Sequence, residues 1–278
     1  MKKVNNRIIK GVLCLVTLST MLIGQNNILT KGYAQDTYSE VAGESHTGSF
    51  SVDSLTLQPG ATTTSINLNW YAPAGTTVAK IQFGDQTYDV TAKPLTSPTE
   101  IKSDKYTDTG KLVCKTTISN LKPDTKYTYY ISNDGGTTWS KEYNYTTPSS
   151  NEFTFGFTSD PQIKENKEIN SEGWNPSDET NQTGWATMME TLEKQGVDLV
   201  VSAGDQVEDQ NWGKSSEYEA FFAPEEMTSI PYAPAVGNHD RHYMFADHFN
   251  LPNQMESLTE VKTTFRGQNS GTSQSHGN

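Results

Sequence analysis

The sequence has only two cysteines, Cys14 and Cys114, in 278 residues. Because Cys14 lies in an N-terminal segment that we expect to be cleaved, one thiol remains and an intramolecular disulfide is excluded. Cys114 stands between Val113 and Lys115, which is typical of a small buried strand residue and not of a nucleophile. Hydrophobic cores must therefore supply the stability of the fold.

Long apolar runs are also scarce, and the one present spans residues 11–24. Four basic residues precede it within the first ten positions, and it falls short of the about 20 residues that a transmembrane helix needs. This order, followed by small residues at Gly32 and Ala34, is typical of a secretory signal peptide. We predict a signal peptide over residues 1–34, a protein that is secreted, extracellular or cell wall-associated, and no membrane contact after cleavage.

Positive charge is in short supply, with 21 Lys and Arg residues against 33 Asp and Glu. The formal net charge is −12, and it becomes −17 once residues 1–34, with five basic residues and no acid, are removed. Such an acidic surface repels phosphate backbones, and no basic cluster offsets it. We therefore expect no nucleic-acid partner.

The region 50–148 has the pattern of an all-β domain. Residues 65–70 alternate between polar and apolar and end in Trp70, and turn residues separate such segments. The segment 121–129 reads Leu-x-Pro-x-Thr-x-Tyr-x-Tyr. This spacing resembles fibronectin type III domains, where the first tyrosine, here Tyr127, hydrogen-bonds back to the chain at a corner between strands. We predict a fibronectin type III-like sandwich with Trp70 in its core, preceded by a flexible leader over residues 35–49.

Over residues 151–278 strands alternate with helices. Strand-like segments at 153–158, 197–203 and 230–236 are separated by helical patterns at 185–192 and 217–222. The three strands end in the motifs Ser159-Asp160-Pro161, Gly204-Asp205 and Gly237-Asn238-His239-Asp240. Because such units bring the carboxyl ends of parallel strands to one edge of a sheet, we expect the three motifs to meet there.

These motifs resemble those of the calcineurin-like metallophosphoesterases, in which Asp-x-His, Gly-Asp and Gly-Asn-His-Asp or Gly-Asn-His-Glu follow one another. The β domain in front of them is similar to the arrangement in bacterial relatives of purple acid phosphatases. The resemblance implies a multidomain protein, with the sandwich followed by the first half of an α/β metallophosphoesterase domain of four αββα layers. It also implies a hydrolase whose substrate is a phosphate ester.

For the site, the resemblance implies two metal ions, with Fe, Mn or Zn as candidates. Asp160 would bind one ion, Asp205 would bridge both, and Asn238 would bind the second, while a hydroxide between the ions attacks phosphorus. His239 would stabilise charge or protonate the leaving group. Gln162 stands where the family has a histidine, and because its amide offers an oxygen we keep it as a metal ligand.

The sequence departs from the family pattern in two further ways. Glu208 stands where purple acid phosphatases have a tyrosine that binds ferric iron, so we expect no purple colour. The later histidines of the family, including a Gly-His-x-His pair, are not found after His239, and residues 253–278 resemble an insert cut off in mid-loop. We therefore expect a fragment that binds metal poorly.

A different hypothesis is a non-catalytic exported module whose sandwich binds a cell-wall or matrix polymer. A hydrolase with a serine or cysteine nucleophile has less support, since no Gly-x-Ser-x-Gly motif occurs and the remaining cysteine lies in the sandwich.

Overall fold

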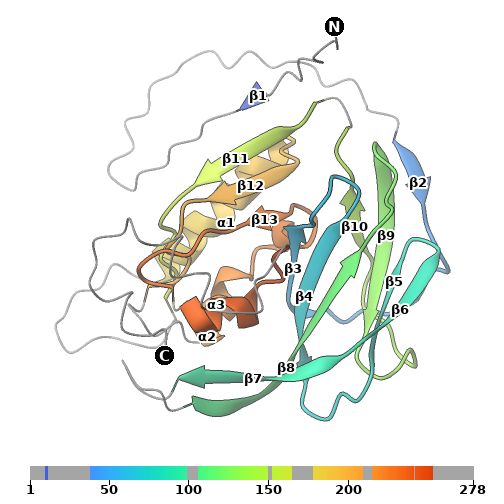
Figure 1. Cartoon of the computed structure of the whole chain (residues 1–278), viewed down its shortest axis with the longest axis horizontal. Helices are drawn as coiled ribbons and strands as arrows, with labels where there is room; N and C mark the ends of the chain where they lie inside the picture. Colours follow the sequence, from blue (N-terminus) through green and yellow to red (C-terminus); the bar gives the residue numbers. More distant parts are fainter. Residues whose placement is uncertain are drawn as a thin grey trace, which may run out of the picture.

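The computed structural model describes residues 10–11, 38–98, 106–149, 152–164, 178–208, 215–240 and 242–252. The cleavage site after Ala34, the insert around Trp174 and the segment 253–278 lie outside the described residues. Figure 1 shows two parts side by side, a β-sandwich at the right and a parallel sheet with helices at the left. This is the order of domains that the sequence predicts.

The sandwich consists of two sheets. The first has the strand order β10 (Tyr143–Thr146), β9 (Thr125–Ser132), β5 (Ala79–Phe83) and β6 (Gln86–Val90), and β2 (Ser39–Val41) also pairs with β9. The second has the order β3 (Asp53–Pro59), β4 (Ile66–Pro73), β8 (Tyr106–Ile118) and β7 (Ala92–Pro98). Apart from β2, neighbouring strands are antiparallel, as expected for a sandwich.

The alternation read from residues 65–70 separates the two faces of β4. Ile66, Leu68 and Trp70 are buried in the core between the sheets, and Trp70 is fully buried. The hydroxyl of Tyr127 accepts a hydrogen bond from the N–H of Lys122 at 2.8 Å, which is the backward bond that the sequence predicts for this tyrosine. Cys114 is buried in β8, and burial raises the pKa of its thiol to about 12, so the thiol is not a nucleophile.

Part of the predicted flexible leader is ordered, so that prediction is wrong over β2. Residues 39–41 pair in parallel with residues 125–127 of β9. This pairing is possible because β5 pairs only with residues 129–132 on that side of β9, which leaves the start of β9 open to another strand. The unpaired backbone groups at the start of β9 thereby gain partners that the local sequence of the leader does not reveal.

In the second part, three parallel strands follow the predicted order. They are β11 (Thr154–Thr158), β12 (Leu199–Ser202) and β13 (Tyr232–Ala233), and β1 (Lys10–Gly11) pairs with β11. β13 is shorter than the predicted 230–236 segment because Pro231 and Pro234, which have no N–H, flank its two residues. β1 falls within the predicted signal peptide, and cleavage after Ala34 would remove it.

The helices described in this part include the two that the sequence predicts, over residues 185–192 and 217–222. They are α1 (Asp178–Lys194), α2 (Ser215–Phe221), the 3₁₀ helix η1 (Glu225–Thr228) and α3 (His242–His248). Trp185, Met189 and Leu192 of α1 are buried, and Leu192 packs so close to Gly156 of β11 that a Cβ there would lie 2.8 Å from it. Among the residues described, none of the helices combines the length and apolarity that crossing a bilayer requires.

The two parts share a hydrophobic cluster. Tyr71, Leu95 and Val113 of the sandwich belong to the same buried cluster as the aromatic residues of α2 and α3. The cluster includes Tyr218, Phe221, Phe222, Tyr232, Phe245 and Phe249. The sandwich is therefore packed against the α/β part through a shared hydrophobic core.

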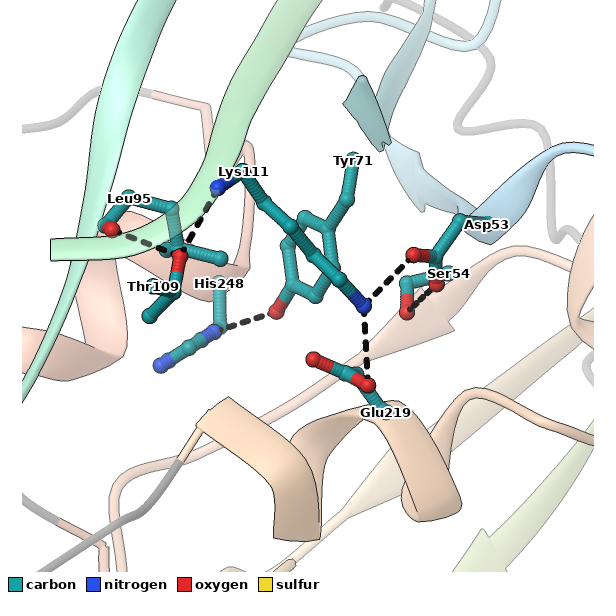
Figure 2. A network of polar contacts seen from close by, with 8 residues as sticks. All are labelled: Asp53, Ser54, Tyr71, Leu95, Thr109, Lys111, Glu219 and His248. Carbon is teal, nitrogen blue, oxygen red and sulfur yellow. Dashed lines mark hydrogen bonds and ion pairs between the residues drawn. The ribbon is translucent and has the colours of Figure 1, made fainter. Parts of the chain in front are cut away.

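Polar contacts fix the register of this interface. Figure 2 shows Lys111 of β8 between two carboxylates, with Nζ 2.7 Å from Asp53 of the sandwich and 2.9 Å from Glu219 of α2. At the other side, the Asn250 side-chain amide donates to the carbonyl oxygens of Leu68 at 3.1 Å and Thr116 at 2.7 Å. The loop after α3 is thereby held against the outer face of β4 and β8.

His248 lies at the centre of the interface and is fully buried. Its Nδ1 is hydrogen-bonded to the Tyr71 hydroxyl at 2.5 Å, and its ring stacks on Tyr218 with centroids 3.8 Å apart. Burial, with a smaller contribution from the charge of Lys115, lowers the pKa of His248 from 6.5 to about 3. The imidazole is therefore neutral in the folded protein at ordinary pH.

This histidine should make stability depend on pH. Below pH 6.5 the unfolded chain takes up a proton on His248 and the folded chain does not, so the free energy of unfolding falls as the pH decreases from about 6.5 toward 3. Replacing His248 by asparagine should remove this contribution, which has a slope of up to about 1.4 kcal/mol per pH unit. Urea unfolding at a series of pH values measures it.

Tyr71→Phe is the matched control, because it removes the hydroxyl that bonds His248 and leaves the imidazole in place. It should lower the free energy of unfolding by about 1 kcal/mol without flattening the pH dependence. Equal slopes for wild type and His248→Asn would contradict the assignment.

Candidate metal centre

The site lies beyond the carboxyl ends of β11, β12 and β13. Asp160 follows β11, Asp205 follows β12, and Asn238 and His239 follow β13. Parallel pairing of the three strands brings these loops to the same edge of the sheet, as the sequence predicts.

Backbone hydrogen bonds continue past the strands and join the first two loops. The N–H of Asp160 donates to the carbonyl of Gly204 at 3.1 Å, and the N–H of Gln162 donates to the carbonyl of Asp205 at 3.0 Å. Ile163 then forms an isolated parallel bridge with Val207. The two loops therefore run side by side, and Asp160 is held next to Asp205 by the main chain.

The loop after β13 lies directly against the loop after β12, and the contact leaves no room for a side chain on either glycine. A Cβ on Gly204 would lie 2.7 Å from the Cα of Gly237, and a Cβ on Gly237 would lie 2.0 Å from Oδ1 of Asp205. Gly204 also has a φ of 124°, a conformation that other residues rarely adopt. Both glycines of the predicted motifs are therefore required by the close contact between loops.

Three predicted ligands have strained backbones. Asp160, Gln162 and Asp205 have φ values of 55°, 45° and 53°, in the left-handed region. Each such residue costs of order 1–3 kcal/mol, and in proteins such strain is concentrated at functional sites. The surrounding hydrogen bonds must therefore offset the cost of presenting these side chains.

The two aspartates interact directly. Burial raises the pKa of the Asp205 carboxyl above its ordinary value, and Asp160 adds to the rise through its charge and a side-chain hydrogen bond. The N–H and the ring of His239 act in the opposite direction. Asp205 is buried, with 6% of its surface exposed, whereas Asp160 and Asn238 are exposed. This edge of the sheet therefore carries one buried and two exposed side chains with oxygen donors.

His239 is attached at two points to the loop after β12. Its N–H donates to Oδ1 of Asp205 at 2.7 Å, and its ring Nδ1 is hydrogen-bonded to the carbonyl oxygen of Glu208. Because a carbonyl only accepts, Nδ1 is the ring nitrogen that carries a proton in this bond. Glu208 thus serves the site through its backbone, while its carboxylate lies 3.5 Å from Nζ of Lys164.

Asp240 is part of the same assembly but is turned inward. Its carboxylate accepts the N–H of Gln206 at 3.1 Å and the N–H of Gly237 at 2.9 Å. Burial raises its pKa to about 6, although the hydrogen bond from Gly237 opposes the rise. The sequence points to Asp240 only as the last residue of a motif, and nothing in the pattern indicates that it joins two loops.

The donor set suits a hard cation in part. Carboxylate and amide oxygens are the ligands such ions accept, and Asp160, Asp205, Asn238 and Gln162 supply them. Within the described part of the chain, no three His, Cys, Asp or Glu side chains form a metal-binding group by themselves. A metal here therefore fits only if amide oxygens or solvent complete the two carboxylates, and Asp160, Gln162, Asp205 and Asn238 all stay predictions as ligands.

Comparison with known families gives two matches. The family model described as purple acid phosphatase, N-terminal domain, matches residues 52–147. The one described as calcineurin-like phosphoesterase matches residues 114–272, more than half of the chain. The ranges overlap over 114–147, which the structure assigns to the sandwich.

One solved structure is similar over most of the chain. It is that of purple acid phosphatase PPD1 isolated from yellow lupin (Lupinus luteus) seeds, with a TM-score of 0.52 and 18% identity, covering 73% of this chain and 41% of that one. At this identity the likeness shows a shared fold, and this chain spans about two fifths of the length of that protein. The search of curated proteins gave no match.

Because of the contact between the loops, replacing Gly204 by alanine should change the free energy of unfolding in the opposite direction to replacing Gly184. Gly204→Ala should lower the free energy of unfolding by roughly 1–3 kcal/mol or more, because the new methyl group meets the backbone of Gly237 and the φ is unfavourable. Gly184→Ala is the control, since Gly184 is exposed on α1 with open space around it. That change should stabilise by about 0.5–1 kcal/mol. Urea unfolding measures both, and equal stability of Gly204→Ala and wild type would refute the contact.

Proposed function

Since the chain belongs to the calcineurin-like phosphoesterase family, we propose that it hydrolyses phosphate esters with two metal ions at the carboxyl edge of its parallel sheet. The observation that carries the proposal is the adjacency of Asp160 and Asp205, whose loops are joined by backbone hydrogen bonds, with the loop of Asn238 against Asp205. Two carboxylates placed together repel each other, and a cation between them is the simplest reason for such an arrangement. The family match does not favour the alternative of a non-catalytic wall-binding module.

The proposed role of each metal ligand follows from how far its side chain is buried. Asp205 is buried and fixed by the N–H of His239, so it suits the shared position between two ions. Asp160 and Asn238 are exposed at either side and suit one ion each, and Gln162 is a further oxygen donor beside Asp160. When bound, two such ions neutralise the phosphate oxygens and lower the pKa of a coordinated water.

His239 supplies the proton chemistry. The Glu208 carbonyl holds the ring and fixes its proton on Nδ1. Nε2 is then the atom that donates a proton to the leaving alcohol when the ring is charged.

We also propose that residues 50–148 are fibronectin type III-like, that residues 151–278 belong to an αββα phosphoesterase domain, and that the protein is exported. The backward bond of Tyr127 supports the first of these. Export is supported by the N-terminal segment, in which basic residues precede an apolar run.

The test of the metal centre is direct. Mn²⁺ or Zn²⁺, supplied at high concentration because the expected affinity is low, should bind to the protein in a calorimetric titration and promote hydrolysis of a simple aryl phosphate. Asp205→Asn should abolish both, because it removes the shared carboxylate. Glu190→Gln, on the exposed face of α1, is the control and should change neither. If neither ion binds to the wild type, the proposal fails.

The role of His239 is tested by a substitution that keeps a hydrogen-bond donor in place of Nδ1 and removes Nε2. In His239→Asn the side-chain amide can still donate to the Glu208 carbonyl, whereas Nε2 is lost. We expect kcat to fall by about 10²–10⁴-fold. Metal affinity should change little, because the N–H that holds Asp205 belongs to the backbone. A kcat equal to that of the wild type would exclude His239 as the acid.

A further inference from the structure

The carboxylate of Asp240 is saturated with hydrogen-bond donors. Oδ1 accepts from the N–H of Gln206 at 3.1 Å and from the Tyr218 hydroxyl at 3.4 Å, and Oδ2 accepts from the N–H of Gly237 at 2.9 Å. The Gln206 amide, in the orientation that satisfies both its ends, adds a bond from Nε2 to Oδ2 at 2.7 Å. Only 2% of Asp240 is exposed. A carboxylate so occupied is not available as a metal ligand.

The donors lie next to the predicted ligands in the chain. Gln206 follows Asp205, and Gly237 precedes Asn238. The two N–H groups thus belong to different loops, each of which carries one ligand, and a single carboxylate receives both. Because the Gly204 and Gly237 backbones touch, a small shift of either loop would separate these ligands.

Asp240 is itself supported from the sandwich. Tyr218, which donates to Oδ1, is fully buried and stacks on His248 with an interplanar angle of 18°. His248 is in turn hydrogen-bonded to Tyr71 of β4. A continuous series of buried side chains therefore runs from the second sheet of the sandwich to the loops of the metal centre.

We propose that Asp240 is a positioning residue that holds the Asp205 and Asn238 loops at the separation metal binding requires, and that the sandwich supports it through Tyr71, His248 and Tyr218. This inference rests on the proposed function, since it assigns Asp205 and Asn238 as ligands. Asp240 touches neither metal nor substrate. It acts by satisfying the N–H groups that hold the two loops in place.

Asp198 is a matched control. It is a partly buried aspartate at the other end of β12, and its carboxylate accepts the N–H of Thr154 at 2.6 Å. Asp198→Asn and Asp240→Asn each replace a carboxylate that binds backbone N–H groups in the same sheet. They differ in that only Asp240 is next to the site.

The experiment titrates the full chain with Mn²⁺ in a calorimeter and measures thermal melting of the same samples. Asp240→Asn should bind Mn²⁺ about 10–100-fold more weakly than wild type. Asp198→Asn should bind Mn²⁺ within about twofold of wild type even where its melting temperature falls as much. Asp240→Ala is a second variant if the asparagine does not fold. Affinity for Mn²⁺ that is unchanged in both Asp240 variants overturns the proposal.

Hydrogen exchange separates failure of this inference from failure of the proposed function. In Asp240→Asn the N–H groups of Gln206 and Gly237 should exchange at least about tenfold faster, and that of Thr154 at its wild-type rate. Asp198→Asn should show the reverse. If the wild type binds no Mn²⁺, the proposed function fails, and the exchange rates alone then decide whether Asp240 joins the loops. Unchanged protection of Gln206 and Gly237 overturns that as well.

Discussion

The candidate site depends on one close contact, the approach of the Gly204 and Gly237 backbones beyond the ends of β12 and β13. No Cβ fits at either position, so a larger residue would push the loops apart. The contact brings Asp205 beside the Asn238 and His239 backbone, and the N–H of His239 then orients the Asp205 carboxylate. The positive φ values of Asp160, Gln162 and Asp205 are further costs of the same arrangement.

The sandwich matters to the site because it shares a hydrophobic cluster with the helices that follow the parallel strands. Its second sheet supplies Tyr71, Leu95 and Val113 to that cluster. A buried histidine, hydrogen-bonded to Tyr71 through Nδ1, and a lysine paired with two carboxylates also lie in the interface. The two parts are therefore joined by a packed interface, and we expect a change in the second sheet of the sandwich to affect the loops that carry Asp205 and Asn238.

The chain belongs to the calcineurin-like phosphoesterase family, and its described residues offer an incomplete set of metal ligands. Two carboxylates and two amides are suitable oxygen ligands, and the ring of His239 is held through Nδ1 by the carbonyl oxygen of Glu208. The described residues do not provide three acidic or histidine ligands in one place. Amide and solvent oxygens would therefore have to supply more of the metal ligands here than in a site built from histidines.

The sequence by itself determined the class of each region, because the period of its apolar residues and its turn residues are local properties. It predicted the strands 153–158 and 197–203, the α1 stripe with Trp185, and the order of Asp160, Asp205 and Asn238 along one sheet edge. Tertiary structure alone decided the pairing of β2 with β9, the burial of His248 between the two parts, and the role of Asp240. Each of these depends on a partner more than 30 residues away in the chain, and a pattern of neighbouring residues contains no record of such contacts.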